Sequence, residues 1–168
     1  KNSSFTDFTY SSPRISGEGA LLTLDAPVKS FGILGSFLVV SCGRGSWFQT
    51  NYEQIAVGTT LAETLKVKKL NTGVDQGAQN QESTVQLGNA IIFLSHEPAV
   101  RMISNPDELQ GLDPRTLSNP IKPDFDAEDF TNACATWFKN AYYLSAPNNS
   151  RLYILEFIED ADGKLKRF

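Results

Sequence analysis

The chain reads LGSFLVVS at residues 34–41, LGNAIIFLS at 87–95 and FKNAYYLS at 138–145. In each copy, a Gly or Lys followed by Ser or Asn leads into an apolar run that closes on serine. The copies recur about every 50 residues, a period that is typical of blades or arrays. The three segments therefore predict a repeated architecture instead of one unrepeated core.

Strand signals surround the first copy. Residues 32–41 and 46–52 predict a hairpin, because the intervening residues 42–45 include two glycines that can adopt positive φ. Residues 64–70 place apolar side chains at alternate positions, which predicts a half-buried edge strand. A short apolar stretch at 21–24 precedes the hairpin.

Two more strand groups follow the first. Residues 160–163, Asp-Ala-Asp-Gly, predict a hairpin turn in the last group. Residues 71–82 are polar and predict a surface loop, and residues 105–116, which contain two prolines, predict one or two helical turns. The predicted strands are 84–87, 90–94 and 100–103 in the second group, and 132–138, 142–145, 151–158 and 164–168 in the third.

A second repeat accompanies the first. TLDAPVK at 23–29 and TLSNPIK at 116–122 share the pattern T-L-x-x-P-[V/I]-K. Proline cannot donate to a strand ladder, so it suits the first residue of a strand or a crossing between sheets. We interpret the motif as a linker that begins a new blade, with a chance match as the alternative.

These signals predict an all-β fold of antiparallel sheets that resembles a β-propeller. We expect about three blades, at residues 21–70, 76–122 and 123–168, whereas a sandwich would show evenly spaced strands without a larger unit. A closed ring typically needs about four to eight blades, so the propeller would be incomplete, or the repeats would pack as a smaller sheet assembly. The first residue is not methionine and the only methionine is Met102, which favours part of a longer protein or a processed product.

Composition excludes several functions. Hydrophobic residues make up 40% of the 168 residues and aromatic residues 11%, which is enough for a packed core. The net charge of −4 predicts no electrostatic attraction to nucleic acid or to an anionic membrane. Apolar runs such as 90–94 are too short to span a bilayer, and no secretory signal is recognised.

Few residues suit catalysis or metal binding. His96 is the only histidine, and its neighbours Ser95 and Glu97 would point away from it on a tight turn, so no Ser–His–acid site is expected. One histidine and two distant cysteines cannot supply an ordinary four-ligand zinc set. We predict that Cys42 and Cys134 are buried thiols and that the chain holds no catalytic, metal or cofactor residues.

The acidic run DFDAED at residues 124–129 is the strongest candidate for a cation site. Alternating carboxylates can surround calcium, but the glycine and the final glutamate of a calcium loop are missing, which favours a solvated loop. Glu159, Asp160 and Asp162 form a looser group. A glycosidase that uses the 124–129 acids is a further hypothesis, although nothing places an acid and a nucleophile across a pocket.

Aromatic residues gather in two places. At strand spacing such residues usually belong to the core, whereas an exposed aromatic shelf would suit a glycan or a protein partner. They are Trp47, Phe48 and Tyr52 after the first predicted turn, and Trp137, Tyr142 and Tyr143 in the third group.

The series formed by 23–50, 85–104, 117–126 and 138–157 resembles bacteriophage virion propeller proteins. It is most similar to the tail nozzle, or tail-tubular B, proteins of short-tailed phages. Their blades have a strand that follows a glycine and ends in serine, a short turn, and an apolar strand that ends near an arginine, as at 87–101 here. The family offers no catalytic residue, and its members are several times longer than this chain.

The resemblance implies a structural, non-enzymatic subunit, six copies of which would surround a DNA channel in a phage tail. It implies a homo-oligomer that contacts other virion proteins, and that contacts DNA only as the DNA passes through the channel. No membrane or cofactor is implied. The modest negative charge suits a channel in which DNA slides. The alternative is a propeller domain that binds a glycan or a receptor through an exposed Trp47 or Trp137.

Overall fold

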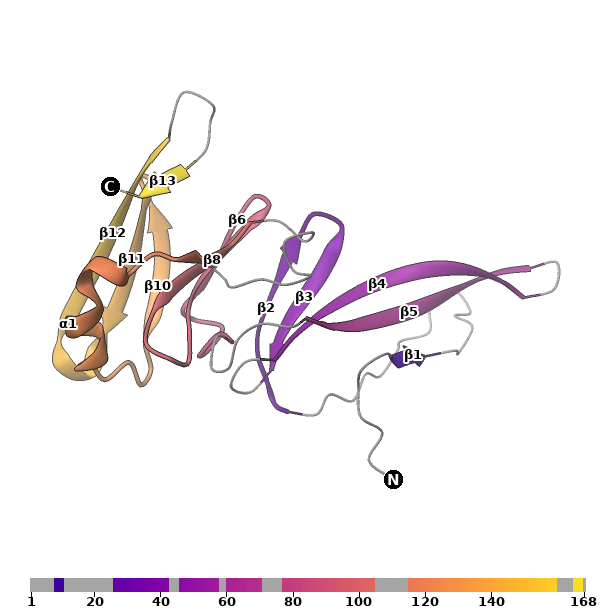
Figure 1. The fold of residues 1–168 in the computed structure, drawn as a ribbon, viewed down its shortest axis with the longest axis horizontal. Helices are drawn as coiled ribbons and strands as arrows, with labels where there is room; N and C mark the ends of the chain where they lie inside the picture. Colours follow the sequence, from indigo (N-terminus) through magenta and orange to yellow (C-terminus); the bar gives the residue numbers. More distant parts are fainter. Residues whose placement is uncertain are drawn as a thin grey trace.

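The computed structural model describes residues 8–10, 26–42, 46–57, 60–70, 77–104, 115–159 and 165–167. Within these ranges most residues lie in β-strands, and helix is limited to short segments (Figure 1). All the described strand pairs are antiparallel, so the all-β antiparallel class is confirmed. The stretch predicted at 21–24, the turn at 160–163 and most of 105–116 lie outside the described residues.

Three open sheets lie side by side along the molecule (Figure 1). Their strand orders are β1-β5-β4-β3-β2, β6-β7-β8-β9 and β10-β11-β12-β13. The first sheet comprises β1 (Phe8–Tyr10), β2 (Val28–Leu34), β3 (Phe37–Cys42), β4 (Ser46–Val57) and β5 (Thr60–Leu70). The second comprises β6 (Thr84–Leu87), β7 (Ala90–Leu94), β8 (Val100–Ile103) and β9 (Arg115–Thr116), and the third β10 (Cys134–Phe138), β11 (Ala141–Ala146), β12 (Arg151–Glu159) and β13 (Leu165–Arg167).

The predicted strands of the second and third groups are confirmed, but two predictions for the first group are wrong. Residues 32–41 are not one strand, because a turn at Gly35 and Ser36 divides them between β2 and β3. The strand predicted at 64–70 belongs to β5, which is not an edge strand, because β1 pairs with it on the side away from β4. The hairpin between β3 and β4 is confirmed.

The repeated sequence pattern is a repeated hairpin. In each sheet it supplies the two-residue turn and the second strand of the first hairpin. Such turns need positive φ at the first or at both central positions, which Gly and Asn adopt most readily. The φ angles are 59° at Gly35, 52° at Gly88, 47° at Lys139 and 59° at Asn140. The residues that pair across the turns are Leu34 with Phe37, Leu87 with Ala90, and Phe138 with Ala141.

The second sequence repeat is not a structural repeat. Pro27 directly precedes β2, as expected of a linker that begins a strand. Pro120 lies instead in the 3-10 helix η2 (Asn119–Ile121), which leads into α1 (Lys122–Asp126). Proline suits a helix start because its missing N–H would have no partner there. The interpretation as a blade linker is therefore wrong for residues 116–122. The described helical turns lie at 119–126 and in the 3-10 helix η3 (Pro147–Asn149).

The second sheet is buried on both faces, because it is packed between the other two. Side chains of β7 point alternately to either side, and the sequence Ala-Ile-Ile-Phe-Leu is continuously apolar for that reason. The cluster toward the first sheet comprises Leu34, Val39, Ala78, Ile91, Phe93 and Ile103. The cluster toward the third sheet and α1 includes Ile92, Leu94, Val100, Met102, Phe125, Tyr142, Leu144, Leu155 and Phe157.

Backbone hydrogen bonds to one amide side chain join the first and second sheets. The Ile33 N–H donates to Gln86 Oε1 at 2.8 Å, and Gln86 Nε2 donates to the Ile33 carbonyl at 2.7 Å. Strands β2 and β7 approach closely beside this pair of hydrogen bonds, since a Cβ at Gly32 would lie 2.5 Å from Ile91 Cδ1. Glycine at this position allows the close approach.

Residues 77–83 join the second and third sheets. Of the surface loop predicted at 71–82, Gln81 and Glu82 are exposed as expected, Ala78 is buried, and residues 71–76 lie outside the described residues. The Ser83 carbonyl accepts a hydrogen bond from the buried Tyr142 hydroxyl at 2.7 Å. The Ala135 N–H donates to the Glu82 carbonyl at 2.8 Å. Because these bonds connect residues distant in sequence, the segment links the second sheet to the third.

The strands that open the repeated hairpin, β2, β6 and β10, lie near one another, since both β2 and β10 contact β6. This arrangement is compatible with the inner strands of successive propeller blades. None of the sheets built from the described strands is closed, however, and no ring of blades is formed. The observed architecture is therefore a stack of three open antiparallel sheets.

Candidate assembly faces and polar networks

The outer face of the third sheet has several exposed apolar side chains, together with the exposed polar residues Thr136 and Glu156. Tyr143 of β11 and Ile154 of β12 are paired neighbours on this face, while the adjacent residues Leu144 and Leu155 point into the core. The rings of Phe138 and Tyr143 lie 6.4 Å apart between centroids. We call the set the third-sheet face: Phe138, Leu152, Ile154 and Ile158, which are 48–59% exposed, and the half-buried Tyr143.

The outer face of the first sheet also has exposed apolar side chains. Phe31 and Ile33 alternate along β2 with buried residues, and Leu38 of β3 pairs directly with Ile33. These three side chains, which we call the first-sheet face, are 57%, 56% and 43% exposed. Residues of the opposite parity, Leu34 and Val39, belong to the core cluster.

Exposed apolar side chains are unusual on the outer face of a sheet covered on one side only, although Val40, which pairs with Phe31 on the first-sheet face, is buried. Such antiparallel sheets ordinarily alternate apolar residues toward the core with polar residues toward water. Contiguous exposed apolar side chains mark sites of interaction with another molecule. The first-sheet face and the third-sheet face are therefore suited to binding another apolar surface.

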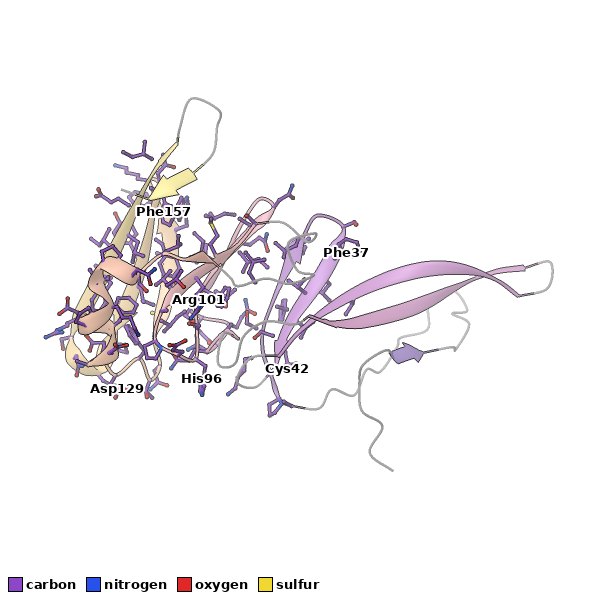
Figure 2. All side chains as sticks on the ribbon, viewed as in Figure 1. Phe37, Cys42, His96, Arg101, Asp129 and Phe157 are labelled. Atoms are coloured by element: carbon purple, nitrogen blue, oxygen red, sulfur yellow. The ribbon has the colours of Figure 1, made fainter. Side chains whose placement is uncertain are left out.

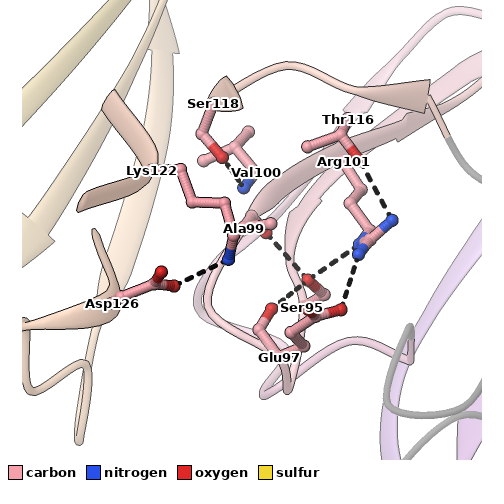
Figure 3. Close-up of polar contacts among 9 residues, drawn as sticks. All are labelled: Ser95, Glu97, Ala99, Val100, Arg101, Thr116, Ser118, Lys122 and Asp126. Carbon is pink, nitrogen blue, oxygen red and sulfur yellow. Dashed lines mark hydrogen bonds and ion pairs between the residues drawn. The ribbon is translucent and has the colours of Figure 1, made fainter. Parts of the chain in front are cut away.

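Arg101 organises a polar network at the β7–β8 turn (Figures 2 and 3). Its buried guanidinium donates to Ser95 Oγ, Thr116 Oγ1 and Glu97 Oε2, each at 3.0 Å. The Ser95 hydroxyl in turn donates to the Ala99 carbonyl at 3.0 Å. These bonds fix the turn to β9, so the network is a structural one.

Glu128 is the centre of a second network, beside α1. Its carboxylate is buried and accepts hydrogen bonds from the Tyr153 hydroxyl and the Asn149 amide, and Arg151 NH1 lies 3.3 Å from Oε2. The Tyr153 hydrogen bond is the main cause that lowers the pKa of Glu128 below its ordinary value, and Asn149 and Arg151 lower it further. Burial and the Glu128 contact raise the pKa of Tyr153.

Two other acids of residues 124–129, Asp126 and Asp129, also have polar contacts. Asp129 accepts from the Thr131 N–H at 2.9 Å and from Asn148 Nδ2 at 2.6 Å, and these bonds lower its pKa. Asp126 forms an exposed ion pair with Lys122 at 2.8 Å. Within the described ranges, no three His, Cys, Asp or Glu side chains gather as metal ligands. The group at 159–162 falls outside the described side chains.

The histidine and the cysteines are far from forming one site. His96 is exposed in the turn after β7, as predicted (Figure 2). Its backbone N–H donates to the Gly77 carbonyl at 2.9 Å. Cys42 is buried in β3, as predicted, but Cys134 is exposed in β10. The prediction for Cys134 is wrong because position 134 lies on the outer side of the third sheet.

The aromatic residues of the third group belong mainly to the core. Trp137 is half-buried against the core cluster, with its ring 5.2 Å from that of Phe157 between centroids. Tyr142 is buried, and burial raises its pKa. The side chains of Trp47, Phe48 and Tyr52 lie outside the described residues.

Sequence reasoning identified the strands of the third-sheet face but not their exposure. The missed signal is the near-continuous apolar run Leu-Tyr-Ile-Leu-Glu-Phe-Ile at 152–158. A run of this kind is typical of strands covered on both faces, as β7 is. In the structure only one face of β12 is covered.

Comparison with known protein families, with curated proteins and with solved structures finds no match to this chain. Among the described residues, no helix is long and apolar enough to cross a membrane. The described residues form a stack of three sheets, with exposed apolar side chains on the outer faces of the first and the third sheet.

Proposed function

We propose that this chain is a structural subunit of a phage tail or a related virion, and that it acts by assembling into an oligomer around a DNA channel. The main support is the pair of exposed apolar faces at opposite ends of the sheet stack. A protein that works by assembly needs surfaces that lose water on contact with neighbours, and burial of apolar area is the dominant favourable term in such association.

The proposed architecture is propeller-like, with one blade in each of the spans 21–70, 76–122 and 123–168. The repeated first hairpin and the proximity of β2, β6 and β10 support it. Closed propellers typically have about four to eight blades. The three sheets of the described residues are too few for a ring, so we propose that further sheets from neighbouring subunits complete it.

The proposed relation to DNA is passage without tight binding. The net charge of −4 offers no attraction to phosphates, whose neutralisation by Lys and Arg dominates affinity for DNA. The charge therefore supports a role as the wall of a channel in preference to a role as a DNA-binding module. The role in the assembly is mechanical and requires no catalytic residue.

Mass spectrometry of virus particles tests the proposal. Particles would be purified by density gradient from the source of the sequence, disrupted, and separated into tail and capsid fractions. We expect peptides of this chain in the intact particles and enriched in the tail fraction. Peptides present in infected cells but absent from purified particles would refute a virion role.

A further inference from the structure

We infer that the third-sheet face of one copy binds the first-sheet face of a second copy, head to tail, so that the sheet stack continues from subunit to subunit. This inference deepens the proposed assembly role and rests on it. Its basis is the repeated hairpin, which lets equivalent positions be compared across the three sheets.

The residue before each turn points toward the following sheet. Leu34 is fully buried in the cluster shared with the second sheet. Leu87, at the equivalent position, packs against the cluster shared with the third sheet. Phe138 occupies the same position in the third sheet, which no further sheet follows among the described residues, and is exposed. The third-sheet face is thus the kind of face that packs on a following sheet.

The second residue after each turn points toward the preceding sheet. Ile91 is fully buried in the cluster shared with the first sheet, and Tyr142 is buried in the cluster shared with the second. Leu38 is their equivalent in the first sheet, which no other sheet precedes in the part of the chain that the structure describes, and is exposed. The first-sheet face is thus the kind of face that packs on a preceding sheet.

The two faces are therefore complementary in kind. Both sheet contacts inside the chain join a face that points toward the following sheet to one that points toward the preceding sheet. A second copy docked head to tail repeats this contact, whereas pairing two third-sheet faces would join like faces, for which the chain has no example. Head-to-tail contacts are heterologous, and they generate closed rings or open stacks.

The test uses one blocked face on each of two variants of the full chain. Ile154→Asp places a charge on the third-sheet face, and Ile33→Asp places one on the first-sheet face. Both side chains are at least half exposed, so the substitutions spare the core. Asn119→Asp adds the same charge to an exposed site on neither face and is the matched control. Mass in solution would be measured by light scattering coupled to size exclusion over a concentration series.

We expect the wild type and the control to self-associate, and each blocked variant to be a monomer. An equimolar mixture of the two variants should then form a heterodimer and nothing larger, because each variant retains the face that the other lacks. Circular dichroism establishes that the variants are folded, and the pair Leu152→Asp and Phe31→Asp repeats the experiment at neighbouring positions.

Two results separate the inference from the proposed function. If the wild type associates but Ile33→Asp still forms homodimers, or if the folded variants do not pair when mixed, the head-to-tail contact is wrong and assembly stands. A wild type that is monomeric at every concentration overturns both the contact and the assembly role.

Discussion

Substitution of Arg101 by Met should destabilise the protein by detaching the β7–β8 turn from β9. Met retains an unbranched apolar side chain in the buried site and removes the guanidinium, which donates to Ser95, Thr116 and Glu97. Hydrogen bonds that involve a charged group contribute about 1.5–3 kcal/mol each, but burying the guanidinium offsets part of this.

The distribution of exposure along the network sets the expected size of the effect. The Glu97 side chain is 49% exposed and the Arg101 side chain 7%. The Arg101–Glu97 ion pair is therefore exposed to water at its Glu97 end, and exposed pairs contribute about 0–1 kcal/mol to stability. Most of the effect must come from the buried Ser95 and Thr116 contacts, and we expect a total loss of about 2 kcal/mol. For a chain of this size that loss lowers Tm by about 4–8 °C.

Urea denaturation of wild type, Arg101→Met and Glu97→Gln measures these differences. Glu97→Gln is the control, because it removes the exposed end of the network alone and should cost less than about 1 kcal/mol. Hydrogen exchange gives a local readout at the Leu117 N–H, which donates to the Val100 carbonyl at 2.7 Å. In Arg101→Met, the protection of this amide against exchange should fall by more than the loss of global stability alone would cause. Equal stabilities of Arg101→Met and Glu97→Gln, with Leu117 still protected, would refute the reasoning.

Three further substitutions test other parts of the fold. Because its hydrogen bonds hold the pKa of Glu128 below 4.5, its stabilising contribution is present above that pH and is lost as pH falls through the lower folded value. Glu128→Gln should therefore show a smaller acid-induced fall in Tm than wild type in a pH series of melts, and parallel curves would contradict this. Tyr142→Phe leaves the Ser83 carbonyl without its donor and should cost about 1–3 kcal/mol in urea denaturation, so an unchanged midpoint would exclude that role. Lys139→Gly relieves a positive φ of 47° and should raise Tm by relieving about 1 kcal/mol of strain, which a lower Tm would disprove.

The local features of the fold were predictable from the sequence. β7 and β8 were predicted at the residues where they occur, because continuous apolar runs between turn residues indicate strands whatever lies around them. The exposed turn position of His96 followed from equally local signals. The division of 32–41 was missed, although its Gly35-Ser36 step matches the Gly-Asn and Lys-Asn turns of the other two copies.

Long-range contacts could not be predicted in the same way. The acids at 124–129 suggested a solvated loop, but Glu128 is buried because Tyr153 and Asn149 come from a strand and a turn more than twenty residues away. Pro120 matched Pro27 in sequence yet begins a helix, since the segment before β10 packs Phe125 into the core. In both cases the outcome depends on neighbours that no local pattern specifies.

The sequence by itself determined the strands, the repeated hairpin and the alternation of side chains along each strand, because these depend on backbone preferences over a few residues. Only the tertiary structure decided which of the alternating faces are covered. Leu34 and Phe138 hold the same place in the repeat, yet one is buried and the other exposed. The physical reason is that burial depends on whether another sheet lies above the face, and the third sheet has no neighbour on its outer side within the described chain.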